Sequence, residues 1–381
     1  MRVLHLFSNW KWTGPAELAV NLCRTLRDEG VDVRFACCRG PGSSENDTVA
    51  DKARQAGLEP VTSFHLGKHR NLVLNALDIG KLRGFLREQQ IQIVHTHLCN
   101  DHLIGGTAAR KTDPRITVVR TSYFGDGFKR TLLNRRLLSK HTDVLIESSR
   151  AALENDRKLV ERAGLLSTVV DPALDTGRFS PDRAFPEMRK KYGLADNDFV
   201  VGIVARMQWH RRFDVFLQAV ALARKSVHNL RVLIVGRGTN RERVAIQPAR
   251  EMGLSDCVVF PGYLQADEYV GILAAMDVKV FLVPGTDGTC RALREAMAMG
   301  KPAVVARRGM LPEIVDHDVN GFVVDDTASN IAGAIRQLAH DRQKTAKMGR
   351  NALKKALERY TLKRQAEAVR AIYEEVAVPR P

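Results

Sequence analysis

Short apolar runs alternate with helical segments along this chain, and the alternation occurs twice. The runs of the first series lie at residues 2–7, 31–38, 91–97, 115–122 and 142–149. Those of the second lie at 199–205, 231–236, 257–263, 278–285, 302–307 and 321–325. Between them leucines recur at helical spacing, as Leu18, Leu22 and Leu26 do. This βαβ alternation predicts an α/β protein with two doubly wound parallel sheets, whose ligands bind at the carboxyl ends of the strands.

Domain boundaries follow from the interruption between the two series. Residues 166–181 become rich in Pro, Asp and Gly, which is typical of a connection between domains. We therefore expect an N-terminal domain over 1–175 and a C-terminal domain over 176–358. The remaining residues, 359–381, are expected to form a helix that packs back on the N-terminal domain.

The composition is that of a soluble globular protein with a strong positive charge. The formal net charge of +16 favours an anionic partner such as phosphate, nucleic acid or a lipid surface, although a positively biased surface alone would also give it. Six cysteines without paired metal-binding spacing fit a reduced cytoplasm. The first residues predict a strand rather than a secretion signal, and no apolar run is long enough for a membrane span.

The stretch "GTDGTCRALREAMAMGKP" (285–302) follows a strand and opens a helix. The backbone N–H groups and partial positive charge of a helix N-terminus suit a phosphate, and Gly285 and Gly288 allow a close approach. The carboxylates of Asp287 and Glu295 can accept hydrogen bonds from vicinal hydroxyls. A phosphate between two polyols is a nucleotide sugar. The alternative is an ordinary exposed helix start, where Asp is favoured anyway.

Several segments together resemble one known family. The region from Asp287 to Asp325 resembles the acid-x7-Glu region of the retaining glycosyltransferases of family 4, which have the GT-B fold of two Rossmann-like domains. "GIVARMQWHRRFDVF" resembles the family's Arg-x4-Lys segment, with Arg211 in place of the Lys. "RVLIVGRG", "LDTGRFSP", "TGPAE" and "IVHTH" are similar to further segments of the family. The resemblance extends over nearly the whole chain.

The resemblance implies a role for individual residues. The N-terminal domain would face the acceptor and the C-terminal domain would hold the nucleotide sugar. The residues implied are Arg206 and Arg211 for the diphosphate, Glu295 for the ribose, Asp287 for the transferred sugar, the backbone N–H groups of Thr289, Cys290 and Arg291 for the phosphates, His97 beside sugar and phosphate, and Gly14 in a closing loop.

This sequence departs from the family pattern at several of these positions. Asp287 stands where Glu is usual, Thr289 and Cys290 where Phe and Gly are common, and Arg212 where Gly is common. Pro15 replaces a second glycine and removes a donor. These changes leave the reaction class intact and the substrate open.

Other residues have two interpretations each. Tyr263 follows a strand end, so it either borders the nucleotide base or simply occupies a turn. Trp209, between the two arginines, either stacks on a ligand or caps the surface. His95 shares a strand with His97, and we expect it to be packed. Glu17 is expected to complement the helix dipole rather than act as an acid.

The activity implied is a retaining, metal-independent hexosyltransferase. Arginines and a helix N-terminus stabilise the leaving diphosphate, and we recognise no Asp-x-Asp motif or histidine cluster in the sequence that would bind a metal. We therefore expect no metal and no cofactor beyond the donor substrate, a UDP-sugar by family frequency. The acceptor would be a cell-envelope glycan or a lipid-linked acceptor, as in lipopolysaccharide biosynthesis, with the protein at the inner face of the cytoplasmic membrane.

Two further observations concern partners. Residues 129–140, "KRTLLNRRLLSK", combine five cations with four leucines, as a surface-binding amphipathic helix does, and a helix packed in the core also needs such leucines. A nucleotide-sugar epimerase of the same fold and a basic nucleic-acid-binding protein are the alternative functions. With 6% aromatic residues and charge spread over both halves, we expect no nucleic-acid partner.

Overall fold

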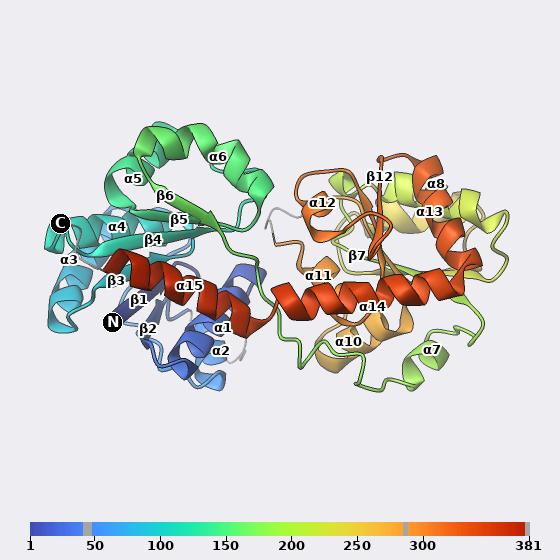
Figure 1. Cartoon of the computed structure of the whole chain (residues 1–381), viewed down its shortest axis with the longest axis horizontal. Coiled ribbons are helices and arrows are strands. Elements are labelled where there is room, and N and C mark those ends of the chain that lie inside the picture. Colours follow the sequence, from blue (N-terminus) through green and yellow to red (C-terminus); the bar gives the residue numbers. More distant parts are fainter. Residues whose placement is uncertain (41–47, 285–288, 378–381) are drawn as a thin grey trace. The chain divides into compact units, whose positions relative to one another are not determined.

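The computed structural model describes residues 1–40, 48–284 and 289–377. Figure 1 shows the course of the chain. It divides into two compact units. The body of unit 1 combines Met1–Ala173 with Leu362–Pro381, and that of unit 2 combines Leu174–Gly285 with Cys290–Thr361. The second unit therefore begins directly after residue 173, and the last helix returns to the first unit.

Unit 1 is built on a parallel sheet with the strand order β2-β1-β3-β4-β5-β6. Its strands are β1 (Arg2–Phe7), β2 (Asp32–Cys37), β3 (Ile93–Thr96), β4 (Thr117–Ser122), β5 (Val144–Glu147) and β6 (Leu166–Val169). Its helices are α1 (Gly14–Asp28), α2 (Val49–Gln55), α3 (Leu72–Glu88), α4 (Cys99–Thr112), α5 (Leu132–His141), α6 (Arg150–Ala163) and α15 (Leu362–Ala377). The central strands are buried almost throughout, as expected where helices cover both faces.

Unit 2 repeats this architecture, with the strand order β12-β11-β10-β7-β8-β9. Its strands are β7 (Phe199–Val204), β8 (Leu230–Val235), β9 (Val258–Gly262), β10 (Val278–Phe281), β11 (Ala303–Ala306) and β12 (Gly321–Val324). Its helical segments are α7 (Glu187–Lys191), η1 (Trp209–Arg211), α8 (Phe213–Arg224), η2 (Glu242–Ile246), α9 (Gln247–Glu251), α10 (Ala266–Ala275), α11 (Arg291–Ala298), α12 (Leu311–Ile314), α13 (Ala328–His340) and α14 (Arg342–Arg359). The predicted α/β class with two parallel sheets is confirmed.

Helix α15 packs on the sheet of unit 1. It contacts α1, and its Ala366, Val369 and Tyr373 are buried in one cluster with strand residues such as Val3 and Ile93. The end of the chain therefore supplies part of the first unit's core.

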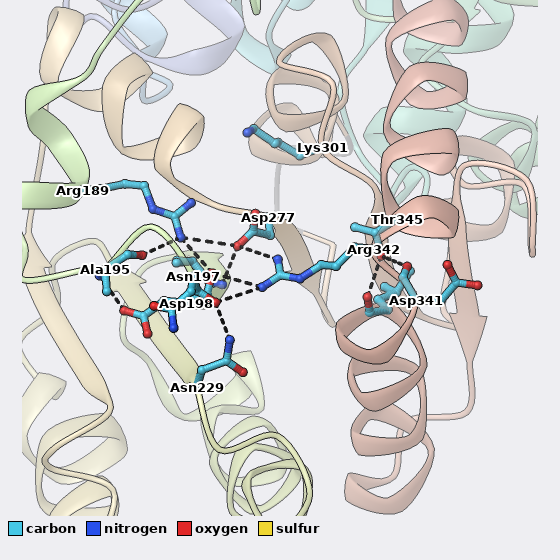
Figure 2. A network of polar contacts seen from close by, with 12 residues as sticks. Arg189, Ala195, Asn197, Asp198, Asn229, Asp277, Lys301, Asp341, Arg342 and Thr345 are labelled. Carbon is cyan, nitrogen blue, oxygen red and sulfur yellow. Dashed lines mark hydrogen bonds and ion pairs between the residues drawn. The ribbon is translucent and has the colours of Figure 1, made fainter.

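A polar network closes the amino edge of the sheet in unit 2. Asp277 directly precedes β10 and accepts a hydrogen bond from the Val200 amide at 2.7 Å. The guanidinium groups of Arg189 and Arg342 lie 3.7 and 3.6 Å from the same carboxylate and approach it from two sides, as Figure 2 shows. Arg342 also donates to the Asp198 carbonyl at 3.3 Å. Strands β7 and β10 are thus tied to α7 and α14 at the edge opposite the one that carries the loops discussed next.

Candidate functional site

The carboxyl edge of the unit 2 sheet carries two of the predicted cations. Arg206 follows β7 and is exposed. Arg211 lies in η1 and donates from its guanidinium to the carbonyl of Val283 at 3.2 Å, just beyond the end of β10. This contact places a fixed positive charge at the carboxyl end of β10. Asp287, the predicted sugar ligand, lies outside the described residues.

Glycines hold the loop of Arg206 in place. A Cβ atom on Gly236 would lie 2.1 Å from the Ala205 carbonyl oxygen, and one on Gly238 would lie 2.4 Å from that of Met207. The turn after β8 therefore packs directly against the backbone on both sides of Arg206, where only glycine fits. The Met207 amide donates to the Arg237 carbonyl at 3.0 Å, which completes the junction.

An exposed cation–aromatic pair lies at the same edge. The guanidinium of Arg237, after β8, lies over the ring of Tyr263, after β9, at 4.3 Å. Tyr263 is 53% exposed, so this pair offers a flat face to a ligand ring. Trp209 is exposed as well. Arg237 was not predicted from the sequence, although its place between Gly236 and Gly238 at a strand end was the signal.

The start of α11 has an unusual backbone. Cys290 is its N-cap and has a φ of 45°, in the left-handed region that favours glycine. Thr289 and Cys290 are both buried. Arg291 opens the helix and donates from Nε to Glu295 one turn later at 2.6 Å.

Glu295 is held in a buried hydrogen-bond arrangement. Its second carboxylate oxygen accepts from the hydroxyl of Tyr269, on α10, at 2.5 Å, and the residue is 1% exposed. Lys279 on β10 is also buried. Burial lowers its pKa to about 7, while the negative charge of Glu295 acts in the opposite direction. The carboxylate is therefore fixed in orientation, and Tyr269 is a positioning residue that sequence reasoning missed.

Two predicted site residues, Gly14 and His97, lie in unit 1. Gly14 is the first residue of α1, after the N-cap Thr13, so it belongs to a helix start and not to a loop. His97 is fully buried. Its Nε2 is hydrogen-bonded to Nδ1 of His5 at 3.0 Å and its Nδ1 to the Tyr123 hydroxyl at 2.8 Å. A ring contact from His97 to a sugar would therefore require one of these bonds to be exchanged.

Asp101 fixes the backbone around His97. Its carboxylate accepts hydrogen bonds from the amides of Ser8 at 2.8 Å, His97 at 3.1 Å and Leu98 at 2.7 Å. Burial raises the pKa of Asp101 to about 6, and the Arg120 guanidinium and the hydrogen bonds from Ser8 and Leu98 oppose that shift. The loops after β1 and β3 are thereby joined through one carboxylate at the first turn of α4.

Three histidines gather beside this junction. His5 pairs in register with His95 on the neighbouring strand, and the His95 ring stacks on that of His97 at 4.6 Å. Ligand atoms of the three lie within 4.8 Å of one another, so the group has the residue types of a metal site. The sequence reasoning did not recognise these three histidines as a group. His95 is packed in the core, as expected.

Apolar and basic side chains are exposed together on two helices of unit 1. Leu132 on α5 is 83% exposed, whereas Leu137 and Leu138 are buried. Leu72 and Val73, at the start of α3, are 88% and 69% exposed. Both helices pack on α4. Among the helices in the described part of the chain, none has both the length and the apolar character needed to cross a membrane.

Comparison with known proteins covers most of the chain. Residues 12–174 match the family described as Glycosyltransferase Family 4, and residues 184–355 match Glycosyl transferases group 1. The D-inositol 3-phosphate glycosyltransferase of Corynebacterium jeikeium is 29% identical over 321 residues, which are 78% of this chain and 76% of that protein. A GDP-mannose-dependent alpha-(1-6)-phosphatidylinositol monomannoside mannosyltransferase of Mycolicibacterium smegmatis is 28% identical over 284 residues, 71% of this chain and 72% of that protein.

Solved structures share the fold at low sequence identity. Anabaena Alr3699/HepE, crystallised in complex with UDP, superimposes with a TM-score of 0.79 at 21% identity and covers 98% of this chain and 100% of its own. A glycosyltransferase from Rickettsia africae ESF-5 superimposes with a TM-score of 0.82 at 14% identity, covering 100% and 99%. The chain has the GT-B fold and belongs to glycosyltransferase family 4.

Proposed function

We propose that this glycosyltransferase transfers a sugar from a nucleoside-diphosphate sugar, with retention of configuration and without a metal ion, to a cell-envelope glycan or a lipid-linked acceptor. The observation that carries the donor assignment is the contact of Arg211 with the Val283 carbonyl. It fixes a permanent cation at the end of β10, where the chain continues toward the N-terminus of α11. A diphosphate is the ligand that such an arrangement suits.

The proposed chemistry follows from the charge of the leaving group. A nucleoside diphosphate gains negative charge as the glycosidic bond breaks, and fixed cations stabilise that charge where it develops. Arg206 and Arg211 would bind the diphosphate, with the backbone amides of Thr289, Cys290 and Arg291 at the other side. Retention would follow from attack on the face that the diphosphate leaves, with a donor phosphate oxygen taking the acceptor proton. The family resemblance supports this last step.

The nucleoside would lie along the same edge of unit 2. Glu295 retains lone pairs beyond its bonds to Tyr269 and Arg291, so that a ribose hydroxyl can donate to it. The Arg237–Tyr263 pair offers a stacking face for the base. We propose uracil as the base. The UDP complex of the Anabaena protein supports this choice, whereas a relative named as GDP-mannose-dependent supports guanine.

A lipid-linked acceptor would bring the protein to an anionic membrane surface. The exposed Leu72 and Val73 of α3 and Leu132 of α5 would contact the lipid, and neighbouring cations such as Arg135 and Arg136 would contact the headgroups. Co-sedimentation with vesicles tests this part. Binding that requires anionic lipid and that falls on replacement of the three apolar residues by Ser supports it, and equal sedimentation of both proteins contradicts it.

A thermal-shift panel of UDP, GDP and their common sugar conjugates tests the donor assignment. A ligand at 100 times its dissociation constant adds about 2.7 kcal/mol of apparent stability. We expect a shift from UDP and a larger one from its productive sugar conjugate. A shift from GDP alone would replace the base, and a panel without any shift would contradict the proposed donor class. Product analysis by NMR of the anomeric proton then tests retention.

A further inference from the structure

A continuous chain of hydrogen bonds runs through the buried core of unit 1. It passes from Thr121 through His95, Tyr373, His5 and His97 to Tyr123, and it engages all six ring nitrogens of the three histidines. The successive distances are 2.6 Å, 2.5 Å, 3.1 Å, 3.0 Å and 2.8 Å. The four inner members are 0% exposed, whereas Thr121 is 9% and Tyr123 7% exposed. Of these six side chains, only those at the two ends have any solvent-exposed surface.

The histidines of the chain are neutral. Burial lowers the pKa of His5 to about 3 and places those of His95 and His97 well below the ordinary value, and the Arg120 charge adds to this for both. A neutral imidazole carries one proton, so that one ring nitrogen donates and the other accepts. Each histidine must therefore choose a tautomer that suits both of its neighbours.

Only two arrangements satisfy every bond. In the first, all three histidines carry the proton on Nδ1: Thr121 donates to His95, His95 to Tyr373, Tyr373 to His5, His5 to His97 and His97 to Tyr123. In the second, all three carry it on Nε2 and every donor becomes an acceptor. A mixed arrangement opposes two N–H groups or two lone pairs between His5 and His97, or leaves a buried group at Tyr373 without a partner. Either defect is unfavourable in a dry core.

We propose that these six side chains form one proton-transfer chain in which the three histidines share a single tautomer, and that Tyr373 of α15 is the positioning residue that joins its halves. Passing from the Nδ1–H to the Nε2–H arrangement moves one proton along each bond. One proton enters from water at Thr121 and one leaves at Tyr123, so that no charge accumulates. Neither end needs a redox partner or a metal.

The shared tautomer decides whether the Tyr123 hydroxyl, at the carboxyl end of β4, can donate a hydrogen bond to a ligand or only accept one. In the Nδ1–H arrangement its oxygen accepts from His97 and its O–H is left to donate to a ligand oxygen. In the Nε2–H arrangement its O–H is used by His97 and its oxygen can only accept. This consequence for a sugar hydroxyl rests on the proposed function, whereas the shared tautomer does not.

Two isosteric substitutions at the ends test the coupling. Thr121→Val leaves Nε2 of His95 without a partner, and an unpaired lone pair is the cheaper defect, so that all three rings should carry the proton on Nδ1. Tyr123→Phe does the same at Nδ1 of His97 and should drive all three to Nε2–H. Nitrogen-15 NMR of histidine-labelled full-length protein distinguishes protonated from unprotonated ring nitrogens. The coupled chain predicts that each variant sets the tautomer of the histidine farthest from it.

The middle of the chain is tested separately with Tyr373→Phe, which keeps the ring and removes the hydroxyl. His95 should then carry its proton on Nε2, while His5 and His97 carry theirs on Nδ1. Tyr360→Phe, a buried tyrosine outside the chain, is the matched control and should keep the wild-type pattern. If Tyr373→Phe does not fold, the two end variants still decide the question.

Three results would overturn the proposal: mixed tautomers in the wild-type protein, end variants that change only the adjacent ring, or uptake of one Zn²⁺ per chain with loss of the ring N–H signals. The last would identify the three histidines as a metal site. These measurements need neither the sugar donor nor the sugar acceptor of the proposed reaction. If the proposed donor proves wrong, the tautomer measurements are unaffected. A failure of the donor assignment can therefore be told apart from a failure of the shared-tautomer proposal.

Discussion

Arg211 is the residue whose replacement tests the diphosphate site most directly. Arg211→Ala removes the guanidinium beside the end of β10, and the loss of a charge-assisted hydrogen bond of roughly 1.5–3 kcal/mol should weaken binding of free UDP about ten- to a hundred-fold. Isothermal titration calorimetry of the variant with UDP measures this change in affinity. Arg224→Ala, which removes an exposed ion pair with Asp256, is the control and should bind UDP as the wild-type protein does. Unchanged affinity in Arg211→Ala would place the nucleotide elsewhere.

The next residue, Arg212, has a backbone conformation that its side chain disfavours. Its φ of 60° is left-handed, and its Nε lies 3.2 Å from Asp326. Arg212→Ala loses the ion pair and keeps the strain, whereas Arg212→Gly loses the pair and relieves it. We expect the glycine variant to be more stable than the alanine variant by about 1 kcal/mol in urea denaturation. The reverse order would mean that this backbone is not strained.

At the scale of elements, the Asp277 network holds strands and helices of unit 2 together at the edge away from the arginines. Asp277→Ala leaves two arginines without their carboxylate and one amide without its acceptor, so the free energy of unfolding should fall by about 1–3 kcal/mol. Asp256→Ala, in an exposed pair, should cost less than about 1 kcal/mol. Differential scanning calorimetry compares the stabilities of the two variants. Equal small losses of stability would show that the network contributes little to the stability of unit 2.

The same network should be separable from ligand binding. Asp277 lies before the first residue of β10, whereas Arg211 contacts Val283 just after its last residue. The affinity of folded Asp277→Ala for UDP should therefore match that of the wild-type protein. A joint loss of stability and affinity would mean that the two edges of the sheet are coupled.

Elements and their order could be predicted because apolar periodicity is local. The strands agree with the two expected series, and the exception is β6 (Leu166–Val169), which lies in residues that were expected to form the connection between domains. The three-histidine cluster could not be predicted in this way. It depends on the register of β1 with β3, and on a tyrosine 278 residues from His95 that α15 brings to the same face.

At the scale of the whole molecule, the proposed mechanism makes a prediction about metal removal. Arginines and the N-terminus of α11 supply the positive charge that a metal ion would otherwise provide. Chelation with EDTA should therefore leave the rate of glycosyl transfer nearly unchanged. A donor-consumption assay before and after chelation measures this. Loss of activity that Mg²⁺ or Mn²⁺ restores would contradict the prediction, and restoration by Zn²⁺ alone would direct attention to the histidines.

The return of α15 to unit 1 has a consequence for synthesis on the ribosome. The residues of unit 2 are translated between the first strands of unit 1 and the helix that buries their cluster. At roughly 5–20 residues per second, that interval lasts on the order of ten seconds or more. During it the nascent first unit exposes the face on which Tyr373 later packs. At its end, unit 2 has its complete sequence before α15 has been made. The second unit can therefore finish folding first, against the order of the chain.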